Sequence, residues 1–195
     1  MTEVLVACLG SKNAEGGRLT EVAKLRADLT IALSNQLLSE GKSVSVVTLG
    51  DHRNNENEPC HGRTLQSYIK PHLDSVDITA YCPPTNTAEE LVALNRFLKP
   101  KENLLIATSP SHTVRVALLA ECLIPNNNFR VIGYELPIDA PINQAAYDRE
   151  SERIARILNA KAVYVPATQE IRPLYETPSN LTVQTKYIPG MKLIG

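Results

Sequence analysis

Two patterns of apolar and polar positions alternate along this chain. Short continuous apolar runs of four to six residues are typical of strands that are buried on both faces of a parallel sheet. Between them lie longer stretches in which apolar residues recur every three or four positions, as in residues 19–40 before Gly41, and this period predicts helices that pack on a sheet. The expected strands are residues 4–9, 44–49, 76–81, 104–108 and 130–134, with a weaker one at 162–165.

This alternation predicts an α/β chain built around one main sheet. We expect a Rossmann-like, doubly wound and mainly parallel sheet of about five to six strands, with helices on both faces. Residues 1–140 form this domain in our interpretation, and residues 141–166 add a helix and a strand packed on it. The segment 167–195 contains several prolines, so we expect an irregular Pro-rich tail that covers the domain or a neighbouring subunit.

Composition and charge argue against several classes of function. The chain has 195 residues, a mass of 21.4 kDa and a formal net charge of -1, which disfavours general binding of nucleic acid or anionic lipid. Its longest apolar run, residues 4–9, is far shorter than the roughly 20 residues of a membrane-spanning helix, and no basic region precedes it. We therefore expect a cytoplasmic protein without a signal peptide, membrane anchor or membrane partner.

The cysteines and the polar loop after the second strand suggest no metal centre. The four cysteines are widely spaced and form no C-x-x-C pair, so neither a disulfide framework nor a zinc ribbon is predicted. Cys8 and Cys122 lie in apolar runs and are expected to be small core side chains. We expect a solvated loop without metal at residues 52–61, because the spacing of its possible ligands matches no common motif: His52, Glu56, Glu58, Cys60 and His61.

Ligands of open parallel sheets bind at the carboxyl ends of the strands, so the residues that follow each strand are candidates. Gly10, Ser11 and Lys12 follow the first strand, in a loop that is either a plain turn or a backbone cradle for phosphate. Gly50 and Asp51 follow the second strand, where Asp51 can accept a hydrogen bond from a ligand hydroxyl. Neither the dinucleotide-binding nor the P-loop glycine pattern is present.

The third expected strand leads to the start of a helix. Thr87 and Glu90 have the spacing of a capping box, which explains Thr87 as a helix-start residue. The capping box does not explain Asn86, whose amide can both donate to and accept from a ligand. Glu89 lies in the same first turn and adds a carboxylate.

The fourth expected strand is followed by the sharpest group of polar residues: Ser109, Pro110, Ser111, His112 and Arg115. If Ser109 is the N-cap and Pro110 the first helical residue, free amides and the positive end of the helix dipole face the crevice. His112 and Arg115 then converge on one anionic group, a phosphate or a carboxylate. The alternative is a packing histidine and a surface ion pair. No G-x-S-x-G elbow is present, so the serines are expected to act as caps rather than nucleophiles.

Together these motifs resemble the YdcF-like domains of unknown function, a family that includes SanA and ElyC. The resemblance covers about residues 4–135 and is carried by four motifs in order: Leu9-Gly10 with Glu15-Gly16 and Arg26, Thr48-Leu49-Gly50, Asn86-Thr87-Ala88-Glu89, and Thr108-Ser109 with His112 and Arg115. It implies a Rossmann-like domain, and members are linked to the bacterial cell envelope, lipid-carrier intermediates and S-adenosylmethionine. The pocket that it implies comprises Gly10, Arg26, Gly50, Asn86, Thr87, Glu89, Ser109, His112 and Arg115.

Three functions are compatible with the sequence. The first is a small enzyme or binder acting on a phosphate-bearing or nucleotide-like ligand, with His112 as acid or base in phosphoryl hydrolysis or transfer and Asp51 or Glu89 orienting it. The second is a non-catalytic nucleotide or S-adenosylmethionine sensor, and the third is a homo-oligomeric assembly component with a vestigial pocket and a tail at the interface. A divalent ion beside the ligand is left open. Additional positive charge in the pocket would come from Lys12, Arg18 and Arg63.

Overall fold

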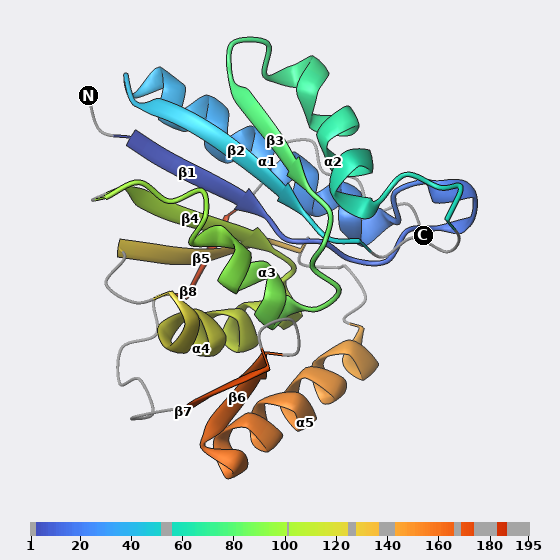
Figure 1. Ribbon diagram of the computed structural model, residues 1–195. Coiled ribbons are helices and arrows are strands. Elements are labelled where there is room, and N and C mark those ends of the chain that lie inside the picture. Colours follow the sequence, from blue (N-terminus) through green and yellow to red (C-terminus); the bar gives the residue numbers. More distant parts are fainter. Residues whose placement is uncertain are drawn as a thin grey trace.

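The computed structural model describes residues 3–51, 56–100, 102–124, 128–136, 143–165, 169–173 and 183–186 of the chain. Its main element is a six-stranded sheet of order β3-β2-β1-β4-β5-β8, in which every neighbouring pair is parallel. This confirms the predicted Rossmann-like α/β fold (Figure 1). The strands are β1 (Glu3–Cys8), β2 (Ser43–Leu49), β3 (Asp77–Tyr81), β4 (Asn103–Thr108), β5 (Asn128–Tyr134) and β8 (Val183–Lys186).

Side chains that alternate along β1 divide the apolar core into two layers. Val4, Val6 and Cys8 belong to the layer under α1 and α2, whereas Leu5 and Ala7 belong to the layer under α3 and α4. Figure 1 shows these two pairs of helices on opposite faces of the sheet. Burial on both faces explains why the strands are continuous apolar runs. The helices are α1 (Glu21–Ser39), α2 (His61–Ile69), α3 (Thr87–Leu94) and α4 (Thr113–Leu123), with short 3-10 turns η1 (Glu15–Gly17), η2 (Lys70–His72) and η3 (Pro110–His112).

The C-terminal part departs from the sequence prediction in its strands. α5 (Gln144–Ala160) contacts η3 and α4, and β6 (Ala162–Val165) pairs with β7 (Glu170–Pro173) in a separate antiparallel sheet. The sixth strand of the main sheet is instead β8, from the segment that we expected to be irregular. Backbone pairing with β5 defines β8, and its sequence carries no apolar run that could have predicted it. The divisions at residues 140 and 166 stay predictions.

Over the residues that the structure describes, no helix combines the length and the apolar character needed to cross a membrane.

Candidate functional site

The carboxyl ends of β1 and β4 lie side by side where the strand order reverses. From β1 the chain continues to α1 on one face of the sheet, and from β4 it continues to α4 on the other face. Gly10 follows β1 closely and Ser109 directly follows β4, and the amide of Leu9 donates to the carbonyl oxygen of Ala107 at 3.3 Å. Ligands of doubly wound sheets generally bind at this end, and two of the predicted site residues, Gly10 and Ser109, lie there.

Arg26, on α1, joins the two strand ends. It is 6% exposed, and its Nη1 donates to the carbonyl oxygens of Leu9, at 3.3 Å, and Gly10, while its Nη2 donates to Ser109 Oγ at 2.9 Å. Burial lowers the pKa of Arg26, although the nearby Glu90 carboxylate opposes that effect. Its Nε makes no hydrogen bond within the described part of the chain. The predicted ligand residue Arg26 therefore holds the glycine loop and the Ser109 turn together.

The imidazole of His112 is the centre of the hydrogen-bond network. The ring is 6% exposed, with Nδ1 3.0 Å from Thr108 Oγ1 and 3.5 Å from Arg26 Nη2. On the other side, Nε2 lies 3.3 Å from Thr87 Oγ1 and 2.6 Å from Arg115 Nη2. The structure thus brings the predicted site residues His112, Thr87 and Arg115 together, with the ring buried.

These contacts also determine the charge of the ring. A guanidinium can only donate, so the short contact from Arg115 makes Nε2 an acceptor and leaves the proton on Nδ1, which donates to the Thr108 hydroxyl. Burial lowers the pKa of His112 well below its usual value, and the positive charges of Arg26, Arg115 and Arg153 lower it further. His112 is therefore neutral at pH 7, with its lone pair directed at Arg115.

Arg115 already has a carboxylate partner in Glu150 of α5. Its Nε donates to Glu150 Oε2 at 2.5 Å and its Nη2 lies 3.4 Å from Oε1, and both side chains are largely buried. Arg153 Nη1 donates to Glu150 Oε1 at 2.8 Å, which is the third hydrogen bond to this carboxylate. Sequence reasoning missed Glu150, because its only link to Arg115 is tertiary. The guanidinium of Arg115, which we expected to bind an anionic ligand, is thus paired with a carboxylate of the chain itself.

The start of α3 is capped one residue earlier than predicted. Asn86 is the N-cap, with its Oδ1 accepting from the Glu89 amide at 3.1 Å, and Glu89 Oε2 accepts from the amide and hydroxyl of Thr85 at 2.8 and 2.9 Å. The predicted capping box of Thr87 and Glu90 is therefore wrong. A cap formed by Asn86 and Glu89 satisfies the helix start and leaves Thr87 facing His112.

Glu90 turns inward and closes the glycine loop. It is 1% exposed, and its Oε1 accepts from the Gly10 amide at 2.7 Å. Burial raises the pKa of Glu90 to about 7, although the Gly10 hydrogen bond and the charges of Arg26 and Arg115 act in the opposite direction. Glu90 lies four residues before the buried Leu94 on the same face of α3, and this spacing is the local signal that could have indicated an inward-facing side chain.

Gly50 and Asp51 tie the loop after β2 to its neighbours through the backbone. The Gly50 amide donates to the carbonyl oxygen of Tyr81 at 3.2 Å, and the Asp51 amide donates to that of Pro84 at 2.8 Å. Gly50 has a φ of 113°, a conformation that favours glycine. A Cβ on Gly10 would lie 3.2 Å from Gly50 Cα, so the two predicted glycines are close together.

The remaining predicted residues lie around this network. Asp51 and Glu89 do not hydrogen-bond to His112, so the predicted orienting contact to the ring is not formed among the described residues. Lys12 is exposed, whereas Ser11 and Ser111 are half-buried. The described residues include no cluster of three or more His, Cys, Asp or Glu side chains suited to a metal ion, and His52 lies outside them.

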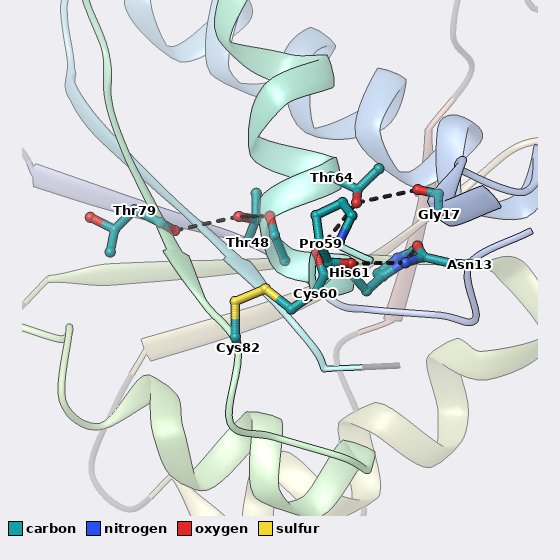
Figure 2. The surroundings of a disulfide bond; sticks show 10 residues. Asn13, Gly17, Thr48, Pro59, Cys60, His61, Thr64, Thr79 and Cys82 are labelled. Carbon is teal, nitrogen blue, oxygen red and sulfur yellow. Dashed lines mark hydrogen bonds between the residues drawn. A yellow bond between two sulfur atoms is a disulfide. The ribbon is translucent and has the colours of Figure 1, made fainter. Parts of the chain in front are cut away.

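A disulfide between Cys60 and Cys82 lies beside the candidate site, and the sequence did not predict it (Figure 2). Cys60 precedes α2 and Cys82 follows β3, and their Cα atoms are 5.8 Å apart. Parallel pairing of β2 with β3 brings these loops together across 22 residues, a separation with no sequence signature. The adjacent His61 Nδ1 lies 2.5 Å from Asn13 Oδ1, which links this loop to the one after β1.

Comparison with known proteins assigns no family to the chain. No protein-family model matches the sequence, and no curated protein is significantly similar to it. The function is therefore argued from the geometry of the site.

Proposed function

We propose that this chain binds a phosphate-bearing or nucleotide-like ligand at the carboxyl ends of β1 and β4. The observation that carries the proposal is the convergence of two buried or half-buried guanidinium groups, Arg26 and Arg115, on the His112 ring at the point where strand order reverses. Arginine provides the planar donors that suit phosphate. The YdcF-like resemblance belongs to the same proposal, because several of the residues that carry it, among them Arg26, His112 and Arg115, take part in this network.

Charge balance supports an anionic ligand. Arg115 is compensated by Glu150, but Arg26 makes its hydrogen bonds to carbonyl and hydroxyl oxygens, which carry no full charge. The carboxyl group that affects the pKa of Arg26 most is Glu90, whose own pKa of about 7 leaves it partly protonated at neutral pH. A ligand phosphate would compensate this excess of positive charge and would compete with Glu150 for Arg115.

Binding without turnover is the form that the geometry favours. A neutral His112 with a low pKa and its lone pair on Arg115 is poorly prepared to act as a general acid. We therefore place a nucleotide or S-adenosylmethionine sensor first, with phosphoryl hydrolysis or transfer by His112 as the catalytic alternative. We also propose a cytoplasmic setting, and a homo-oligomer formed through the tail remains a third hypothesis that the solution mass of the chain tests.

Thermal unfolding of the purified chain tests binding directly. The panel comprises nucleotides, S-adenosylmethionine, S-adenosylhomocysteine, sugar phosphates and pyrophosphate, each with and without a divalent ion. A ligand at about 100 times its Kd adds about 2.7 kcal/mol, which raises the midpoint of a chain of this size by several degrees. Silence across the panel would refute the phosphate proposal.

Two variants and one control locate the ligand and separate binding from turnover. Arg115→Ala is expected to abolish the ligand-induced shift, measured from the midpoint of the variant itself, whereas Arg156→Ala, on the exposed side of α5, should preserve it. For a sensor, His112→Ala weakens binding and no product forms with the wild type. If His112→Ala keeps the affinity but abolishes product formation, the chain is an enzyme.

A further inference from the structure

We propose that the Cys60–Cys82 disulfide is a redox-active site, which a low-molecular-weight thiol reduces from a neighbouring pocket. Both cysteines line a cavity of about 420 Å³ together with Glu56, Glu58 and Arg63. That volume is in the range of small-molecule sites, and the charged side chains of both signs suit a thiol of small-peptide size that itself carries groups of both signs. Access from this pocket distinguishes the bond from a disulfide sealed in a core.

The two cysteine residues differ in exposure. Cys82 is half-buried at the end of β3, whereas Cys60 is only 4% exposed at the start of α2. An incoming thiolate therefore reaches the Cys82 sulfur first. The positive end of the α2 dipole then favours negative charge on Cys60 as the leaving sulfur.

The exchange is balanced in two steps. The first thiolate attacks Cys82 Sγ, forms a mixed disulfide, and the electron pair of the broken S–S bond leaves on Cys60 Sγ. A second thiolate attacks the external sulfur of the mixed disulfide and releases Cys82 as a thiolate. Two small thiols are oxidised to one disulfide, the protein disulfide is reduced by two electrons, and the protons of the two thiols pass to the cysteines.

Hydrogen bonds already hold the two loops that the disulfide joins. Gly50 donates to the carbonyl oxygen of Tyr81, Asp51 donates to that of Pro84, and the His61 amide donates to the carbonyl oxygen of Asp51 at 2.9 Å. Figure 2 shows the disulfide bridging the same junction between β3 and the start of α2. We therefore expect the fold to retain these contacts when the bond is broken, as a reversible site requires.

The other two cysteines have different surroundings. Cys8 is fully buried, and burial raises the pKa of its thiol to about 11. Burial also raises the pKa of the half-buried Cys122. Neither thiol is prepared for exchange at neutral pH, so the pair Cys60 and Cys82 is the chemically distinct one. This role also fits the cytoplasmic setting proposed above, because a disulfide in a cytoplasmic protein is usually transient and redox-sensing.

The test follows reduction of the full, folded chain by reduced glutathione and by dithiothreitol. Free thiols are alkylated at timed intervals and counted by intact mass. We expect the disulfide of the folded chain to be reduced at a rate within about tenfold of that in urea-unfolded chain, because the pocket exposes Cys82. Reduction only after unfolding, or cysteines that stay reduced under oxidised glutathione, would overturn the proposal.

Single variants test the order of attack. With oxidised glutathione at about pH 10, where both thiols are largely ionised and the helix dipole gives Cys60 little advantage, Cys60→Ser should form the mixed disulfide at Cys82 at least about tenfold faster than Cys82→Ser forms it at Cys60. Cys122→Ser is the matched control and should leave the reduction rate of the wild-type disulfide unchanged. Equal rates for the two variants would refute selective attack, and the wild-type comparison stands independently of whether a variant folds.

Discussion

Replacing Glu90 with glutamine should change how stability depends on pH. Glu90 is buried against Gly10 and its pKa is raised to about 7, from 4.5 for an ordinary glutamic acid. The folded chain then binds this proton more tightly than the unfolded chain, by about 3 kcal/mol at about 1.4 kcal/mol per pH unit. Because the folded pKa is the higher one, the wild type loses this stability as pH rises from about 4.5 to about 7, and the loss is complete above that range.

Glu90→Gln keeps an oxygen that accepts from the Gly10 amide but cannot ionise. The difference in free energy of unfolding between Glu90→Gln and wild type should therefore grow by about 3 kcal/mol in favour of the variant between pH 4.5 and pH 8.5. Any constant effect of the new amide group cancels in this comparison. The chain contains no tryptophan, so urea unfolding followed by circular dichroism is the suitable measurement.

Glu152→Gln is the matched control for this experiment. Glu152 lies on α5 with a largely exposed side chain, so its pH profile should stay parallel to that of the wild type. A difference between Glu90→Gln and wild type that does not change with pH, or that favours the wild type at pH 8.5, would refute the reasoning. That result would mean that Glu90 is ionised and compensated by Arg26.

Two further substitutions test contacts around the candidate site. Glu150→Gln should lower the free energy of unfolding by about 1–3 kcal/mol, because Arg115 and Arg153 lose a charged partner. It should also increase the thermal shift caused by pyrophosphate, because the ligand no longer competes with a carboxylate for Arg115. Glu152→Gln serves again as the control, and an unchanged shift would argue against competition. Gly10→Ala places a Cβ 2.6 Å from the Leu49 carbonyl oxygen and 2.8 Å from Glu90 Oε1, so it should cost about 1–3 kcal/mol in urea unfolding. Ser11→Ala is its neighbouring control, and equal midpoints for the two variants would contradict the packing argument.

The main sheet was predictable because its strands are buried on both faces. The run ending at Thr108, for example, is apolar on both sides, and the polar residues Ser109, His112 and Arg115 follow it directly. Strand, turn and helix start are all local features here, so the position of His112 at the carboxyl end of β4 followed from the sequence. β8 is the opposite case, because its pairing with β5 depends on backbone contacts rather than on an apolar pattern.

The partners of these residues were not predictable, because their contacts join segments that are far apart in the sequence. Glu90 contacts Gly10 across 80 residues, and Glu150 contacts Arg115 across 35. For Glu90 the sequence suggested a local role in a capping box with Thr87, whereas in the structure its carboxyl group accepts from the Gly10 amide. For Cys60 and Cys82 no spacing rule applies, since their contact depends on the register of β2 and β3.

Those long-range partners determine how the proposed site can accept an anion. On the Arg115 side the anion has to displace Glu150, which holds the guanidinium through Nε and Nη2. On the Arg26 side an anion favours the protonated form of Glu90, whose pKa lies close to physiological pH. Arginine side chains are suited to binding phosphate, but Glu150 and Glu90 determine how readily Arg115 and Arg26 can bind it. The proposed ligand therefore has to compete with Glu150 and to shift the protonation of Glu90, so its binding is coupled both to α5 and to pH.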